Sequence, residues 1–260
     1  MDSLTFIGTA TTILRLGSFT LLTDPNFLSR GQRAYLGKGL WSRRLTDPAC
    51  RVDELPSLDA VVLSHLHGNH FDRVARKGLD RRPPVVTTQA AARRLSTWGF
   101  TAEGLEPWHE RLFTRGNETL RIEALPAIHA RGVMGRVLPP VIGSLLEHRV
   151  GDDVRRRVLL SGDTLSGDHV DQIRLRHPDV GTAVVHLGGT RVLFHTVTMD
   201  GRQGTDYLRR LRPARALAVH YDDYRVFRSP IEEWVGHAAE AGFGSTTYVP
   251  SRGETVALDG

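Results

Sequence analysis

The chain has 260 residues, of which 40% are hydrophobic and 24% charged, with a formal net charge of +5 at pH 7. This is the composition of an ordinary soluble globular protein whose core needs no disulfide staples. The single cysteine, Cys50, excludes an intramolecular disulfide, and no apolar run approaches the ~18 residues of a membrane span. We therefore expect a cytoplasmic protein with neither a signal peptide nor a membrane-spanning segment.

The first part of the chain predicts a β-meander followed by alternating strands and helices. Between them lies a loop over residues 26–52, rich in glycine and basic residues and long enough to suspect a functional flap. The expected strands are residues 4–8, 11–17, 19–25, 58–65 and 84–88, and the expected helices are residues 71–80 and 89–99.

The second part repeats this order. The expected strands are residues 110–116, 118–127, 143–151, 155–164, 182–189, 215–221, 246–250 and 255–259, with helices near 167–177, 202–213 and 230–242. Both parts run from a meander into β/α units. The pattern predicts the α+β class, a four-layer αββα sandwich of two mixed β-sheets flanked by helices. We expect a single domain over 1–260, built of two similar halves, about 1–115 and 116–260.

Candidate metal ligands fall at or just past the carboxyl end of one apolar run after another. Rigid strands that end together present such loop residues at one rim of a fold. The stretch VVLSHLHGNHFDR, residues 61–73, supplies four of them. The set is Asp24, His65, His67, Asn69, His70, His129, Asp163 and His220.

Imidazoles and carboxylates suit Zn²⁺, and also Mn²⁺ or Fe²⁺. His65 and His67 can converge on one metal, and His129 would complete a three-histidine site with a fourth position for water. His70, His220 and Asn69 would face a second metal, and Asp163 could bridge the two. Two metals ~3.5–4 Å apart can hold a hydroxide between them.

The same residues carry a family resemblance. SHLHGNHFD, the later His129, SGDT and VHYDDY resemble the metallo-β-lactamase superfamily, whose signature is His-x-His-x-Asp-His followed by separate His, Asp and His motifs. GTATTILRLGSFTLLTDPNF, LGGTRVLFHTVTMDG and AVHYDDYRVFRSP resemble the branch that includes L-ascorbate-6-phosphate lactonases and the N-acyl-phosphatidylethanolamine phospholipase D type. The resemblance covers nearly the whole chain. It implies that His65, His67 and His129 bind the first metal, that His70 and His220 bind the second with Asp163 bridging, and that Asp24 orients ligands.

Asn69 departs from the family pattern, which has Asp there as a ligand of the second metal that also orients or deprotonates the attacking water. Asparagine offers a carbonyl oxygen but no charge and no proton acceptor. Losing the carboxylate should weaken the second metal by a few kcal/mol, ~10-fold in affinity for each 1.4 kcal/mol. Three interpretations stay open: a natural one-metal hydrolase, an engineered Asp→Asn change that silences catalysis, and a natural binding protein without turnover. Asp72 is a stand-in base, a helix cap or a residue that orients a ligand.

Other residues are candidates for supporting roles. Thr164 could form a hydrogen bond near Asp163. The flap cations could attract an anionic group, and its aromatic residues could cover an apolar one; the cations are Arg30, Arg33, Lys38, Arg43 and Arg44. The candidate substrate contacts are Tyr35, Trp41, His169, His195 and Tyr221. Five further histidines are expected to be hydrogen-bonded core or surface residues: His109, His148, His177, His186 and His237.

These observations predict a metal-dependent hydrolase that uses a metal-activated water on an ester, lactone or phosphodiester, with an anionic small molecule as substrate. One alternative is a catalytically silent metal- or ligand-binding protein of the same fold. A further alternative is a nuclease, since the chain is basic, but it has no added aromatic and basic module along which a strand could run. We expect no nucleic-acid partner, and the sequence leaves a homo-oligomer open.

Overall fold

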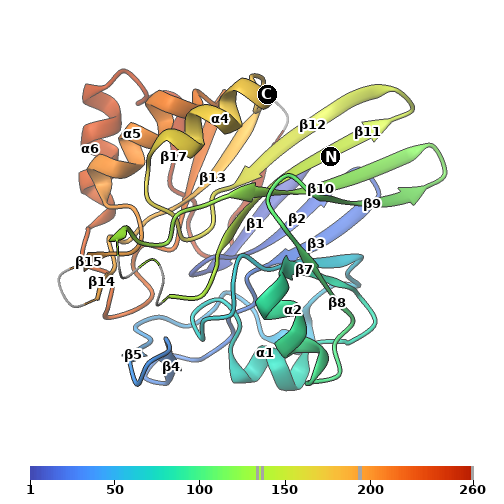
Figure 1. The fold of residues 1–260 in the computed structure, drawn as a ribbon, viewed down its shortest axis with the longest axis horizontal. Coiled ribbons are helices and arrows are strands. Elements are labelled where there is room, and N and C mark those ends of the chain that lie inside the picture. The colour runs from blue at the N-terminus through green and yellow to red at the C-terminus, as the bar shows by residue number, and fades with distance from the viewer. Residues whose placement is uncertain (133–134, 136–137, 193–194, 259–260) are drawn as a thin grey trace.

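Two seven-stranded sheets pack face to face, with helices on both outer sides (Figure 1). The computed structural model describes the whole chain except residues 133–134, 136–137, 193–194 and 259–260. The helices α1 and α2 cover the first sheet, and α4, α5 and α6 cover the second. The expected αββα sandwich of the α+β class is confirmed.

The first sheet has the strand order β18-β1-β2-β3-β6-β7-β8. Its four strands from β18 to β3 pair antiparallel, and the pairs from β3 to β8 are parallel. The bounds are β1 Ser3–Gly8, β2 Thr11–Leu16, β3 Phe19–Thr23, β6 Ala60–Val62, β7 Val85–Thr88, β8 Ala102–Leu105 and β18 Thr255–Ala257.

The second sheet repeats this succession in the order β9-β10-β11-β12-β13-β16-β17, antiparallel as far as β12 and parallel from there on. The bounds are β9 Glu110–Arg115, β10 Glu118–Pro126, β11 Ile142–Val150, β12 Asp153–Leu160, β13 Thr182–His186, β16 Arg215–Val219 and β17 Thr247–Tyr248. Strand β9 thus pairs in the second sheet, although the expected first half runs to residue 115. The late strand β18 returns to the first sheet beside β1.

Three of the helices, α1, α2 and α5, begin at side chains that cap their free N–H groups. Asp72 accepts hydrogen bonds from two backbone N–H groups of α1, and Thr88 and Asp200 each accept one from α2 and α5. The bounds are α1 Arg73–Gly78, α2 Gln89–Ser96, α4 Asp168–Arg176, α5 Gly201–Leu211 and α6 Ile231–Glu240. No helix in the described ranges is long and apolar enough to cross a membrane.

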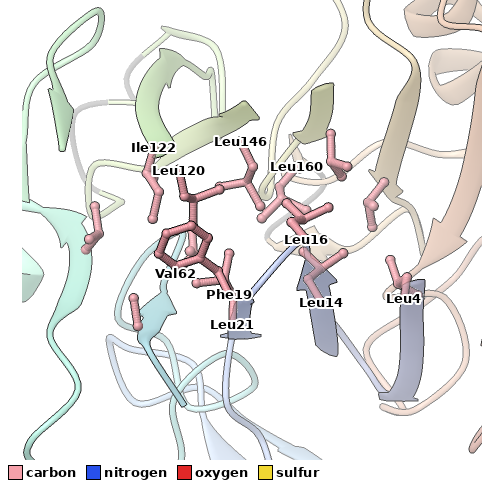
Figure 2. Packing of buried hydrophobic residues seen from close by; sticks show 14 of the residues in the cluster. Leu4, Leu14, Leu16, Phe19, Leu21, Val62, Leu120, Ile122, Leu146 and Leu160 are labelled. Atoms are coloured by element: carbon pink, nitrogen blue, oxygen red, sulfur yellow. The ribbon is translucent and has the colours of Figure 1, made fainter. Parts of the chain in front are cut away.

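The core between the sheets is made of side chains from the inner face of each (Figure 2). In β2, Leu14 and Leu16 point into this core while Ile13 packs on the helix side. In β13, Val184 points inward while Ala183 and Val185 pack against helices, which explains an unbroken apolar run. Each fully buried leucine contributes ~2 kcal/mol to the stability of the folded state. This core anchors the strands whose ends carry the candidate ligands.

Two short hairpins and one edge strand have no counterpart in the sequence expectations. β4 (Arg33–Tyr35) and β5 (Trp41–Arg43) form a hairpin inside the 26–52 loop, followed by a 3₁₀ turn at Val52–Glu54. β14 (Arg191–Val192) pairs with β15 (His195–Thr196), and β8 extends the first sheet. These strands are two to four residues long, too short to show an alternating pattern.

Candidate metal centre

The predicted ligands lie together at one rim of the sandwich, where strands of both sheets end. Asp24 follows β3, His65 follows β6, and His220 follows β16. Asp24 and His220 have φ values of 35° and 63°, a left-handed conformation that is rare for residues with a Cβ. Strained backbone of this kind persists where the surrounding structure over-determines it, and it clusters at functional sites.

His65, His67 and His129 form one cluster, each offering a ligand nitrogen within 4.8 Å of the others. His129 Nδ1 donates to the Val197 carbonyl at 3.0 Å, so Nε2 carries the lone pair. That Nε2 is buried and has no hydrogen-bond partner in the described structure. His65 Nε2 and His67 Nδ1 lie 2.8 Å apart. Lone pairs converging on one small volume, one of them orphaned, fit a divalent cation with three imidazole ligands.

The electrostatics keep these imidazoles neutral. Burial is the main cause that lowers the pKa of His67 to about 3 and that of His220 to about 4, and it also lowers the pKa of His65 and His129. A metal binds only the unprotonated imidazole, so a low pKa favours ligation over protonation.

His70 lies between two carboxylates. Its Nδ1 lies 3.2 Å from Asp24 Oδ2 and its Nε2 lies 3.1 Å from Asp163 Oδ2. Burial disfavours a charged imidazole, but Asp163 and Asp24 outweigh it and raise the pKa of His70 to about 10. The Oδ1 of Asp163 has no hydrogen-bond partner in the described structure and lies 3.6 Å from His220 Nδ1.

Asn69 contacts the ligand with which it would share the second metal. His220 Nδ1 donates to the Leu187 carbonyl at 3.1 Å, and the Asn69 amide Nδ2 lies 2.9 Å from His220 Nε2. The amide therefore donates to the lone pair that a second metal would need. Among the groups whose ligand atoms lie within 4.8 Å of one another in the described residues, none includes His220.

Asp24 accepts several hydrogen bonds behind the candidate metal centre. It accepts hydrogen bonds from the backbone N–H and the hydroxyl of Ser64, and from His186 Nε2 at 3.3 Å. Burial would raise its pKa, but His70 and His186 lower the pKa of Asp24 to about 2. His186 agrees with the prediction of a hydrogen-bonded core or surface residue, since it is buried at the end of β13 and bonded to Ser161 and Asp24.

A pocket of about 400 Å³ opens over the three-histidine cluster. His67, Asn69, His129 and Asp163 line it, together with residues 36–40 of the flap. The other walls are mainly apolar, and two cations, Lys38 and Arg191, reach it. The apolar and cationic lining residues that no sequence pattern singled out are Leu36, Leu40, Leu138, Arg191, Val197 and Val226. A cavity of about 530 Å³ that includes Arg131 and Arg202 contains none of the candidate ligands.

Several expected flap contacts are wrong. Arg44 is fully buried and pairs with Asp223 at 3.4 Å, so it is not available to a substrate. Of the other flap cations only Lys38 lines the pocket, and Arg30, Arg33 and Arg43 do not. Tyr35 and Trp41 lie in a different groove.

The remaining supporting residues are placed as follows. His169 is 7% exposed with Nε2 3.2 Å from Thr164 Oγ1, and Tyr221 stacks on Phe6 in the core, so neither lines the pocket. Thr164 was expected to bond near Asp163, but its hydroxyl accepts from the Ile128 N–H and so holds the loop that carries His129. Asp72 caps α1, which is one of the roles expected for it. The side chain of His195 lies outside the described part of the chain.

Comparison with known proteins places this centre in a family. Residues 20–221 match the family described as Beta-lactamase superfamily domain. The chain is 24% identical over 261 residues to the UPF0173 protein YddR of Bacillus subtilis, covering 97% of this chain and 98% of that protein. It is 25% identical over 209 residues to the UPF0173 metal-dependent hydrolase Ta0764 of Thermoplasma acidophilum, covering 79% and 83%.

The fold is also similar to that of a solved hydrolase. The isothiocyanate hydrolase from Delia radicum gut bacteria superposes with a TM-score of 0.82 at 22% identity, covering 98% of both chains. The name of the Thermoplasma acidophilum relative, a metal-dependent hydrolase, agrees with the enzyme class expected from the sequence. The matched residues span most of the two sheets and all the candidate ligands, and this chain therefore belongs to the metallo-β-lactamase superfamily.

Proposed function

We propose that this protein is a hydrolase that works with one divalent metal, Zn²⁺ in the first instance, on a small ester, lactone or phosphodiester with an anionic group. The observation that carries the proposal is the three-histidine cluster with its orphaned His129 Nε2. A bound metal would polarise the substrate oxygen and lower the pKa of a coordinated water toward ~7.

His65, His67 and His129 would hold this metal. Hydrogen bonds fix two of the rings: Ser64 Oγ lies 3.0 Å from His65 Nδ1, and the Val197 carbonyl accepts from His129 Nδ1. Fixing the outer nitrogen sets the tautomer and the direction of the ligand lone pair. These two rings are thus held in place by the protein itself, which reduces the entropy lost on metal binding.

Asp163 would orient the attacking water in place of the aspartate that the family has at position 69. Asp163 lines the pocket, and its buried Oδ1 has no hydrogen-bond partner among the described residues, so this carboxylate is our candidate to accept a hydrogen bond from the attacking water. His70 donates to its Oδ2 and holds the carboxylate in place. Asn69 can donate a hydrogen bond but cannot accept the proton of the water.

The pocket lining supports a substrate with an apolar body and an anionic end. Leu36, Leu40 and Val226 would contact the body, while Lys38 and Arg191 lie where a negative charge would be stabilised. The double change Lys38→Ala, Arg191→Ala should raise KM for an anionic phosphodiester or lactone more than tenfold. It should leave a neutral ester of the same size within twofold.

The apolar walls also favour a second candidate, a neutral electrophile such as an isothiocyanate, the substrate named for the structural neighbour. We would assay an aryl phosphodiester, a lactone and an aryl isothiocyanate with the metal-loaded protein, and measure bound metal by mass spectrometry. His129→Ala should abolish both metal binding and turnover. Turnover that is unchanged in that variant would contradict the proposal.

A further inference from the structure

A second groove lies between the β4–β5 hairpin and the helices α1 and α2, and it has a volume of about 400 Å³. In Figure 1 the hairpin and α1 occupy the same lower edge of the molecule. His67 is the one residue of the described chain that lines both this groove and the pocket over the metal centre. The groove therefore opens beside the centre but is walled separately.

The charge in this groove is uncompensated. Four exposed arginines line it, and none makes an ion pair within the described residues: Arg33, Arg73, Arg76 and Arg94. Arg73 donates instead to the carbonyl of Arg33 at 3.1 Å. Like charges gathered without a counter-charge repel one another, so an anion in the groove would be stabilised.

The one carboxylate in the lining does not neutralise these arginines. Asp72 is 4% exposed, and its two oxygens accept from the N–H groups of Phe27, Leu28, Val74 and Ala75 at 2.6 to 2.8 Å. Both carboxylate oxygens thus accept hydrogen bonds from backbone N–H groups, and within the described residues Asp72 makes no ion pair with these arginines.

Aromatic rings accompany the charges. Tyr35 and Trp41 are 45% and 57% exposed, with ring centroids 4.9 Å apart. The guanidinium of Arg76 lies 4.1 Å from the centroid of the Trp98 ring, and that of Arg94 lies 5.3 Å from it. Stacking on a ring orients a guanidinium while leaving its N–H edge free for an anion.

We propose that this groove is a binding site for a small organic anion. The apolar body of the ligand lies over Tyr35 and Trp41, and its phosphate, sulfate or carboxylate group contacts the arginines of α1 and α2. The volume is within the ~300–1,000 Å³ of ligand sites. The site goes beyond the proposed hydrolase activity, because it uses neither the metal nor Asp163.

The test uses the metal-free protein and 1-naphthyl phosphate, with quenching of tryptophan fluorescence as the readout, since Trp41 and Trp98 line the groove. The double variant Arg76→Ala, Arg94→Ala removes two lining charges. The matched control is Lys77→Ala, Arg93→Ala, whose side chains are exposed, sit next to these on α1 and α2, and do not line the groove. We expect saturable quenching, a Kd at least tenfold weaker in the first variant, and a Kd within twofold of wild type in the control.

A further variant, Arg73→Gln, leaves the packing on Trp98 intact and should weaken binding about threefold. Equal weakening in both double variants would mean that net charge alone attracts the probe, and it would overturn the site. So would equal affinity for neutral 1-naphthalenemethanol, or displacement by a short oligonucleotide at lower concentration than by free naphthyl phosphate. Binding that appears only after metal is added would place the probe at the metal centre instead.

Discussion

Replacing Asn69 by Asp should convert a one-metal centre into a two-metal centre. In the structure the amide Nδ2 lies 2.9 Å from His220 Nε2, so it donates to the lone pair that a second metal would use. A carboxylate at this position has no donor to offer. It would leave His220 Nε2 free and would add a negative charge beside it.

The size of the effect follows from the charge. Two unit charges ~4 Å apart interact by ~4 kcal/mol at an effective dielectric of ~20, and ~4 kcal/mol is about a thousandfold in affinity. Without metal the same change costs ~1 kcal/mol, because the hydrogen bond to His220 is lost. It should also raise the pKa of His220 from about 4, since a carboxylate stabilises the charged imidazole.

The assay is metal stoichiometry after dialysis against buffered Zn²⁺, together with the melting temperature at each metal concentration. We expect about one metal per wild-type chain and two per Asn69→Asp chain, with a larger thermal stabilisation of the variant by metal. Asn69→Ala is the control, because it removes the amide donor and adds no charge. If wild type and the Asp variant bind equal amounts of metal with equal affinity, the role assigned to Asn69 is refuted.

Three other predictions concern the scaffold. Arg44→Ala should lower the free energy of unfolding by ~3 kcal/mol, because it removes one of the two arginines that pair with the buried Asp223 and leaves Arg252 at 3.3 Å. Urea unfolding measures this loss, and a value below ~1 kcal/mol would contradict the prediction. The Glu147 carboxylate is 1% exposed, and although burial raises its pKa, Arg149, Arg157 and Arg121 lower it from 4.5 to about 2. The ionised carboxylate therefore stabilises the folded state above pH ~4.5, and this stabilisation is lost as the pH falls toward 2. Glu147→Gln should lower the free energy of unfolding by at most ~3 kcal/mol at pH 7 and by little at pH 2.5, which unfolding measured at both pH values would show. Gly68→Ala would place a Cβ 2.6 Å from the Tyr35 carbonyl oxygen, so the flap must shift. We expect the free energy of unfolding to fall by ~1–3 kcal/mol and KM to rise. An unchanged free energy of unfolding together with an unchanged KM would contradict this close packing.

The apolar pattern of the chain was enough to predict the architecture and to place the candidate ligands at strand ends. Apolar runs with period 2 become strands wherever one or both faces are buried, and β2 and β13 show both cases. His65 follows β6 and His220 follows β16, so each lies at the carboxyl edge of the parallel strands of its own sheet. Local chemistry also fixed the cap at Asp72, since an Asp before a helix finds free N–H groups whatever else surrounds it.

The surroundings of the flap and loop residues depend on long-range packing that the sequence pattern does not reveal. Arg44 looks like its neighbours Arg43 and Lys38 in sequence, yet packing against Asp223 buries it, while Lys38 reaches the pocket. His186 became a partner of Asp24 because the two sheets bring the ends of β13 and β3 together. Burial and partner choice depend on contacts between segments far apart in the chain, and no local pattern encodes those contacts.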